Sequence, residues 1–336
     1  MNQSLMAQEA LEAPDVVARF LAQNEGALKT LGKQLRDHPP SVILTAARGS
    51  SDHAATYFKY LIEILLGVPC ASIGASVASV WHSELKLKNA VCLTLSQSGQ
   101  SPDIVSLQAA ARKAGAMTLA LVNQPSSPAE RGADFFLPLC AGPEKSVAAT
   151  KSFIASLVAG AAIAAHWRQD RELLSAVQNL PEKLRAASAI RWDGFLPRAK
   201  AGDSLYVLGR GPSLAIAAET ALKLKETCAL HAEALSFAEV MHGPLELVKP
   251  GFPVLAYAPP DAANTLSQIA LRKITAIGAD VFTVAEDGAA FVRTGHEMLD
   301  PIAMIQTAYL NIEVLAQRLG RNPDAPRLLS KVTETM

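Results

Sequence analysis

The segment "AVCLTLSQSGQSPD", residues 90–103, decides the fold that we expect for this chain. Residues 90–95 form an apolar run that is typical of a buried strand, and residues 104–114 have the pattern of a helix. The turn between them carries Ser96, Gln97, Ser98, Gly99 and Ser101. A strand that leads through a short turn into a helix is part of the βαβ unit from which parallel sheets are built.

Other parts of the chain repeat this alternation. The run "SVILTAARG" at residues 41–49 precedes a helical stretch over 53–66, and "MTLALVN" at 117–123 follows the helix over 104–114. Strands that alternate with helices in this way indicate parallel sheets covered by helices on both faces.

The whole pattern then occurs a second time. "SLYVLGRG" at 204–211 matches "SVILTAARG", and "FPVLAYAPPD" at 252–261 matches the strand and loop at 90–99. The same spacing, 162 positions, separates Arg48 from Arg210 and Ser96 from Ala258. We therefore expect an α/β fold of two tandem domains, each a mainly parallel sheet in a three-layer α-β-α arrangement. The expected boundaries are a helical segment over 1–35, a first domain over 36–165, a helical connector over 166–197, a second domain over 198–325 and a tail over 326–336.

The two copies differ at the end of their second strand, where Ser-Gln-Ser-Gly in the first copy is replaced by Ala258-Pro259-Pro260-Asp261. Ligands of open α/β sheets bind beyond the carboxyl ends of the strands, where helix N-termini offer free N–H groups. Hydroxyl groups there suit a phosphate, and Ser50 and Ser51 follow the first strand in the same way. The plain alternative is helix capping, which we favour for Ser101 taken alone.

Composition excludes several classes of protein. Lys+Arg and Asp+Glu are both 31 in 336 residues, so no basic surface for nucleic acid is expected. The longest apolar window, 153–165, is shorter than the roughly 20 residues that a membrane span needs. The four cysteines form no C-x-x-C pair, and with no signal-peptide pattern at the N-terminus they favour buried thiols in a cytoplasmic protein. We expect neither a metal nor another cofactor, since "GRGPSL" lacks the third glycine of a dinucleotide site.

The densest group of titratable residues lies at 217–248. Glu219, Lys223 and Glu226 share one helix face at i, i+4 and i+7, which alone would suit a solvated ion-pair stripe. The stretch continues with His231, Glu233, Glu239 and His242 among apolar or small residues. Such surroundings favour proton transfer near neutral pH. In the tail, the amine of Lys331 lies among small and apolar residues, where it could meet a sugar carbonyl.

Several motifs together resemble a known family. They are "RGSS", "SQSG" with Ser101, "SVAATKSF" at 146–153, "ALKLKE", "HAEA", "HGPL" and the tail "PRLLSKVT". From about residue 40 to its end, the chain resembles the double sugar-isomerase (SIS) family, and in particular the isomerase half of glucosamine-6-phosphate synthases. The resemblance implies two SIS domains, with the sugar phosphate bound by Ser51, Ser96, Gln97, Ser98 and Ser101.

The same resemblance implies catalytic roles. Glu226 matches the base that moves a proton between C1 and C2, with Lys223 beside it, and His242 matches a ring-opening histidine that the neighbouring subunit of a homodimer supplies. Lys331 matches a tail lysine that meets the open-chain sugar, which includes the possibility of a Schiff base. Val147 and Thr150 match a loop that lines the site, although Ala149 stands where the synthases have serine.

The synthases also have a glutaminase domain with an N-terminal cysteine, whereas this chain begins Met1-Asn2-Gln3 and has about 40 residues before its first strand. We therefore expect the catabolic reaction, in which glucosamine 6-phosphate and water give fructose 6-phosphate and ammonia. Alternatives are a plain aldose–ketose phosphate isomerase, a deglycase or deaminase of a fructosamine or galactosamine phosphate, and a non-catalytic sugar-phosphate sensor. Retention of Glu226, His242 and Lys331 argues against the sensor.

Overall fold

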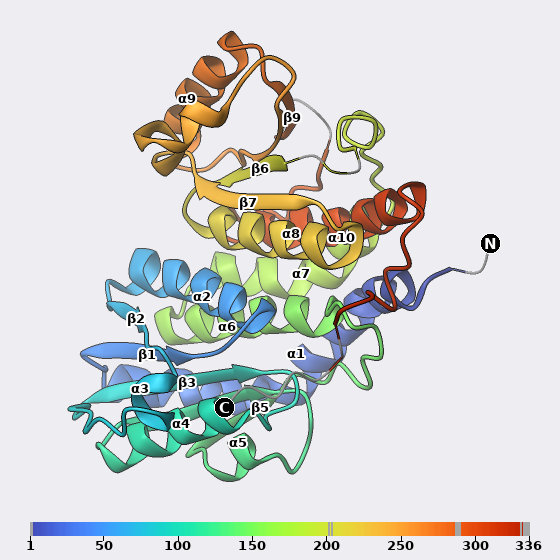
Figure 1. Ribbon diagram of the computed structural model, residues 1–336. Coiled ribbons are helices and arrows are strands. Elements are labelled where there is room, and N and C mark those ends of the chain that lie inside the picture. The colour runs from blue at the N-terminus through green and yellow to red at the C-terminus, as the bar shows by residue number, and fades with distance from the viewer. Residues whose placement is uncertain (1–2, 201, 203, 286–289, 330, 332–336) are drawn as a thin grey trace. The chain divides into compact units, whose positions relative to one another are not determined.

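The computed structural model describes residues 3–200, 202, 204–285, 290–329 and 331, and the chain divides into two compact units. The N-terminal unit comprises Asp15–Glu144 and Lys151–Gln178. The C-terminal unit comprises Lys145–Thr150 and Asn179–Lys331, together with the segment that ends at Pro14. Each unit is built around a parallel sheet of its own (Figure 1).

The sheet of the N-terminal unit has the strand order β2-β1-β3-β4-β5, and every pair is parallel. Its strands are β1 (Val42–Ala46), β2 (Cys70–Ser72), β3 (Ala90–Ser96), β4 (Met117–Val122) and β5 (Phe135–Pro138). Ala46 at the end of β1 lies opposite Thr94 of β3. The segments that follow β1 and β3 therefore leave the sheet side by side at its carboxyl edge.

Helices cover both faces of this sheet (Figure 1). One face carries α2 (Ser50–Leu66) and α6 (Lys151–Arg168), and the other carries α3 (Ser76–Ser79), α4 (Pro102–Lys113) and α5 (Pro128–Arg131). Cys92 of β3 packs with Ile104 and Leu107 of α4 in one apolar cluster. Helix α6 is buried over nearly its whole length, which explains why its sequence is apolar on every side.

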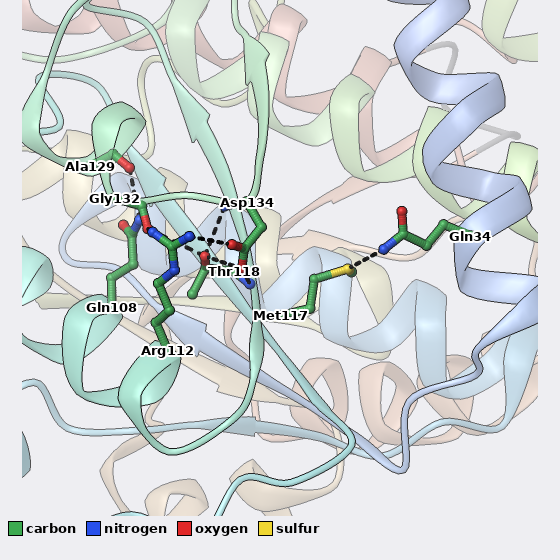
Figure 2. Close-up of polar contacts among 8 residues, drawn as sticks. All are labelled: Gln34, Gln108, Arg112, Met117, Thr118, Ala129, Gly132 and Asp134. Carbon is green, nitrogen blue, oxygen red and sulfur yellow. Dashed lines mark hydrogen bonds and ion pairs between the residues drawn. The ribbon is translucent and has the colours of Figure 1, made fainter.

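Polar contacts hold the β5 edge of this sheet against α4 (Figure 2). The Asp134 carboxylate accepts hydrogen bonds from the Thr118 backbone amide at 2.9 Å and from the Thr118 hydroxyl at 2.8 Å, and it pairs with Arg112 at 2.7 Å. The amide of Gln108 donates to the carbonyl of Ala129 at 2.8 Å. Strand β5 and the short helix α5 are thereby tied to one face of α4.

The first helix, α1, runs without interruption over Leu5–Asp37, and Pro14 lies inside it. Residues up to Pro14 belong to the C-terminal unit and residues from Asp15 onward to the N-terminal unit. In the latter, Gln34 contacts the sulfur of Met117 at 3.1 Å (Figure 2).

The C-terminal unit repeats the first four strands of the N-terminal unit. Its order is β7-β6-β8-β9, all parallel, with β6 (Ser204–Gly209), β7 (His231–Ser236), β8 (Pro253–Tyr257) and β9 (Asp280–Val284). Helices α8 (Pro212–Cys228) and α10 (Asp300–Arg318) cover one face, and α9 (Asn264–Ala276) packs on the other (Figure 1). Helix α7 (Arg171–Ala187) crosses from one unit to the other at Gln178. The expected α/β fold with two parallel sheets flanked by helices is confirmed.

The burial of the cysteines agrees with most of what the composition predicted. All four cysteines are free thiols, and Cys70, Cys92 and Cys228 are buried. Cys140 is only half-buried, and its thiol donates to the side-chain carbonyl of Gln23 at 2.9 Å. Within the described ranges, no helix has both the length and the apolar character to cross a membrane.

Candidate active site

In the N-terminal unit, the serine-rich loop joins the end of β3 at Ser96 to the start of α4 at Pro102. Gly99 has a φ of +64°, and a Cβ atom at this position would lie 2.4 Å from the Ser127 hydroxyl and 2.7 Å from Val122. The backbone N–H of Gly99 donates to the Ser96 hydroxyl at 2.9 Å. Only glycine fits both this backbone conformation and this close approach, so Gly99 sets the shape of the loop.

The side chains of this loop surround the N-terminus of α4 with polar groups. Ser96, Gln97, Ser98 and Ser101 are all half-buried. Ser101 occupies the N-cap position of α4, yet within the described chain its side chain makes no capping hydrogen bond. The capping interpretation of Ser101 is therefore wrong. Its φ of −57° and ψ of 118° are non-helical, as at a cap position, but the hydroxyl accepts no hydrogen bond from the first turn of α4.

A second turn, after β1, completes this edge of the sheet. Ser51 is the second residue of α2, which begins directly after Gly49, whose φ is +54°. Arg48, in the same turn, pairs with Asp103 in the first turn of α4 at 2.5 Å, and the Asp103 side chain is only 1% exposed. This ion pair ties the β1–α2 and β3–α4 turns together. Our sequence analysis missed it, although Arg48 and Asp103 both lie within the motifs that it singled out.

In the C-terminal unit, three charged residues of α8 meet as their spacing predicted. The Lys223 ammonium lies 2.5 Å from the Glu226 carboxylate and 3.4 Å from that of Glu219. The side chains of Glu219 and Lys223 are 0% and 1% exposed, whereas that of Glu226 is 20% exposed. Burial by itself would lower the pKa of Lys223, but the two carboxylates outweigh it and raise this pKa above its usual value. The cluster is thus a buried ion-pair group and not a solvated stripe.

Helix α10 adds a residue that our sequence analysis did not identify. The Tyr309 hydroxyl donates to the Glu219 carboxylate at 3.0 Å, and Tyr309 is fully buried. Tyr309 lies 90 positions from Glu219 in a helix of largely apolar composition, so no local motif connects the two residues.

The loop at Lys145–Thr150 meets the tail lysine in the same unit. The Lys331 ammonium, half-buried, donates to the backbone carbonyl of Ser146 at 2.6 Å. The Glu9 carboxylate of α1 accepts from the backbone amides of Lys145 and Ser146, which fixes the loop from its other side. Val147 is half-buried and Thr150 is buried. The structure thus brings the predicted loop and the predicted tail lysine together.

The tail is anchored before it reaches Lys331. Both carboxylate oxygens of Asp324 accept hydrogen bonds from the first amides of α1, those of Leu5 and Met6, each at 2.8 Å. These amides have no partner within their own helix, so the carboxylate acts as a cap supplied from the far end of the chain. Of the expected tail, residues 330 and 332–336 lie outside the described residues.

Glu226 lines a cavity of about 700 Å³. Glu226 and Lys225 of α8 line the cavity, together with Arg321 after α10 and Arg327 and Leu329 of the tail. Glu226 therefore contacts the buried Lys223 ammonium and also lines a cavity whose wall is mostly apolar and includes three basic residues, Lys225, Arg321 and Arg327. A carboxylate in such a place combines a fixed orientation with access to a reacting proton.

The remaining predicted residues are placed as follows. His242 ends a 3₁₀ helix (Glu239–His242) after β7 and is exposed. His231 and Glu233 are exposed on β7, and among the described contacts none joins His242 to Glu226, Lys223 or Lys331.

Ser51 and the loop at 96–101 belong to the N-terminal unit, whereas Glu226, His242 and Lys331 belong to the C-terminal unit. No group of three His, Cys, Asp or Glu side chains suited to a metal ion occurs in the part of the chain that is described.

Comparison with known proteins places this geometry in context. The chain is 32% identical over 304 residues to the isomerizing glutamine–fructose-6-phosphate aminotransferase of Aquifex aeolicus, a match that covers 86% of this chain and 51% of that protein. It thus spans about half the length of the curated relatives that it matches.

Two solved structures superpose over nearly the whole chain. A candidate phosphosugar isomerase from Silicibacter pomeroyi is 44% identical, covers 96% of this chain and 100% of its own, and has a TM-score of 0.92. Glucosamine-6-phosphate deaminase from Thermotoga maritima has a TM-score of 0.81 over 99% of this chain and 100% of its own, and at 20% identity it shows the shared fold alone.

A family model described as the SIS domain matches this chain twice, over residues 38–166 and over residues 199–307. The two matches fall on the two parallel sheets, and the resemblance to the double-SIS family is confirmed. This chain belongs to the SIS domain family.

Proposed function

We propose that this protein is a glucosamine-6-phosphate deaminase, which converts D-glucosamine 6-phosphate and water into D-fructose 6-phosphate and ammonia. The observation that carries the proposal is the placement of Glu226, which is held by Lys223 at 2.5 Å and lines a cavity of about 700 Å³. A carboxylate that is fixed and still accessible suits proton transfer between neighbouring carbons of a sugar.

The substrate is anchored through its phosphate. In the proposal, the half-buried hydroxyls of Ser51, Ser96, Ser98 and Ser101 and the amide of Gln97 receive the phosphate at the N-terminus of α4. The partial positive charge of this helix end favours an anion. Anchoring at this end limits the positions that C1 and C2 adopt, which lowers the entropic part of the barrier.

The reaction then proceeds by proton transfer and hydrolysis. His242, supplied by a second copy of the chain in a homodimer, assists the opening of the sugar ring. Glu226 removes the proton from C2 and returns it to C1, while a proton passes from the nitrogen to O1, so that the aldehyde becomes an alcohol and the C2 amine becomes an imine. Water adds to the C2 carbon of this imine, the C2–N bond then breaks, and ammonia and the C2 ketone of fructose 6-phosphate are formed. Lys331 contacts the open-chain carbonyl, and Val147 and Thr150 line the site.

The decisive experiment follows both products. The pure protein is incubated with glucosamine 6-phosphate, and ammonia and fructose 6-phosphate are measured together; we expect equal amounts of the two. Glu226→Gln, which keeps the shape of the side chain and removes the base, is expected to lower kcat by at least about 10²-fold while sugar-phosphate binding persists. Full activity of this variant would exclude Glu226 as the base.

A second candidate is a phosphosugar isomerase that releases no nitrogen. The 44% identity to the candidate isomerase from Silicibacter pomeroyi favours it, and the same base would move the proton between C1 and C2. Interconversion of fructose 6-phosphate and glucose 6-phosphate without ammonia release from any amino sugar phosphate would support this candidate. Release of ammonia from galactosamine 6-phosphate, or of a free amine from a fructosamine phosphate, would leave the proposed type of reaction in place and assign it a different substrate.

A further inference from the structure

The charged side chains around Glu226 do not form a simple one-to-one ion pair. Lys223 contributes one positive charge, and Glu219 and Glu226 contribute two carboxylates, at 3.4 Å and 2.5 Å from its ammonium group. If Glu226 serves as a base, it becomes neutral when it takes a proton from the substrate. With Glu226 as its only partner, the Lys223 ammonium would then remain as an uncompensated charge at a site that is 1% exposed, which is strongly unfavourable.

The two carboxylates have different surroundings. Glu226 is 20% exposed and lines the cavity, whereas Glu219 is fully buried. The Tyr309 hydroxyl donates to the same Glu219 oxygen that faces Lys223, at 3.0 Å. A hydrogen bond donated to a carboxylate favours its ionised form, and so does the neighbouring ammonium. Glu219 is therefore built to keep its charge, and Glu226 is placed to exchange its proton.

We propose that Glu219, oriented by Tyr309, is the permanent counter-ion of Lys223, and that this division of charge leaves Glu226 able to change its protonation state. Tyr309 and Glu219 are positioning residues, because they act on the reaction through Lys223 and Glu226. The inference rests on the proposed role of Glu226 as the base. The other charged groups beside Glu226 are Lys225 on α8 and Arg321 and Arg327 across the cavity, and all of them remain unchanged in the variants below.

The chain offers a matched control for Tyr309. Tyr257 of β8 is also fully buried, and its hydroxyl lies 2.7 Å from that of Thr220, the residue next to Glu219 on α8. Tyr309→Phe and Tyr257→Phe each remove one buried hydroxyl and leave the ring in place. Only Tyr309→Phe removes a contact to a charged group, so a purely structural effect should be similar in both variants.

The kinetic test is the pH dependence of kcat and KM. In Tyr309→Phe we expect a severalfold lower kcat, an acid limb displaced to lower pH and an unchanged KM. The reason is that the Lys223 charge is then compensated mainly by the Glu226 carboxylate. This stabilises the ionised form of Glu226 and makes it a weaker base. In Glu219→Gln we expect the same changes at larger size, with kcat lower by about 10²-fold, and partial recovery in Glu219→Asp. Tyr257→Phe should keep the pH profile of the parent protein. Identical profiles for the two tyrosine variants would overturn the proposal.

A second measurement does not depend on turnover. The side-chain carboxyl of Glu226 is followed by ¹³C NMR in protein labelled at glutamate, with Glu226→Gln to assign the signal. We expect the titration midpoint to fall in Glu219→Gln and to fall less in Tyr309→Phe. An unchanged midpoint in Glu219→Gln would refute the division of charge even if the enzyme is active. A protein that turns over no phosphosugar but shows the expected midpoints would refute the proposed function alone.

Discussion

After β1 the chain turns through Gly49 with a φ of 54° and a ψ of −132°, and after β6 it turns through Gly211 with a φ of 59° and a ψ of −137°. The backbone of the two units is thus nearly the same at this point, but the side chains that follow are not. In the N-terminal unit Ser51 is half-buried, whereas in the C-terminal unit Ser213 is buried. The Ser213 hydroxyl is hydrogen-bonded to the backbone N–H and C=O of Arg210, each at 2.9 Å, so it serves its own turn.

The second pair of turns differs in the same sense. The β3–α4 turn of the N-terminal unit carries hydroxyls, whereas the β8–α9 turn carries Pro259, Pro260 and Asp261. Burial raises the pKa of Asp261, whose carboxyl group accepts a hydrogen bond from the amide of Ala263 at 2.8 Å. A carboxylate and two prolines, which donate no N–H bond, are poor partners for a phosphate. Repetition of the fold therefore preserves the turns, whereas the side chains differ, and in our proposal only those of the N-terminal unit receive the phosphate.

The largest effect that we expect within this comparison concerns the glycines of the turns. Gly99→Ala places a Cβ atom 2.4 Å from the Ser127 hydroxyl at a φ of +64°, so strain and overlap act together and should reduce the free energy of unfolding by about 3 kcal/mol. Gly211→Ala has an almost equal φ but no atom within 4 Å, and about 1 kcal/mol is expected. Urea unfolding measures both. Equal losses would mean that the close packing of the phosphate loop contributes nothing.

A smaller effect separates binding from stability at two serines. Ser101→Ala removes a hydroxyl that makes no capping bond, so KM for the sugar phosphate should rise about tenfold, with the free energy of unfolding changed by less than about 0.5 kcal/mol. Ser213→Ala removes a buried hydroxyl with backbone partners, so it should lower the free energy of unfolding by about 1 kcal/mol and leave KM unchanged. Steady-state kinetics and urea unfolding of the two variants test this opposite behaviour. A raised KM in Ser213→Ala would contradict the assignment of the phosphate to one unit.

These elements also show what could be predicted from the sequence. Strand and helix alternation and the repeat indicated both parallel sheets, because local periodicity reports burial on a sheet or a helix face. The spacing of Glu219, Lys223 and Glu226 predicted their common helix face for the same reason. The partners of these residues could not be predicted, since Tyr309 reaches Glu219 across 90 positions and Asp324 reaches Leu5 across 319. Such contacts depend on tertiary packing, which no local pattern records.

The role of Ser101 could not be predicted from the sequence for another reason. Serine before Pro102 is a common capping pattern, yet the Ser101 side chain makes no capping hydrogen bond. A local preference was here outweighed by the structure around it.

The smallest expected effect compares the outermost strands of the two sheets. Asp134 precedes β5 and pairs with Arg112, and Asp280 begins β9 and pairs with Arg198 (Figure 2 shows the first pair). Burial would raise the pKa of Asp134, but hydrogen bonds from the Thr118 amide and hydroxyl, together with Arg112, lower it below its usual value. The carboxyl is 33% exposed, so solvent limits its contribution to about 1 kcal/mol.

The sign of the pH effect follows from this lowered pKa. A carboxyl group with a lower pKa in the folded protein stabilises the fold above its unfolded pKa of about 4, and the contribution is lost as the pH falls through the folded value. Asp134→Asn should therefore reduce the free energy of unfolding by about 1 kcal/mol at pH 7 and by much less near pH 3. Asp280→Asn should have a smaller effect at pH 7. The Asp280 side chain is 41% exposed, and among the described residues no hydroxyl group donates to it as Thr118 does to Asp134. Urea unfolding at the two pH values distinguishes these outcomes, and equal losses in both variants at pH 7 would show that the Thr118 hydrogen bonds add nothing to the ion pair.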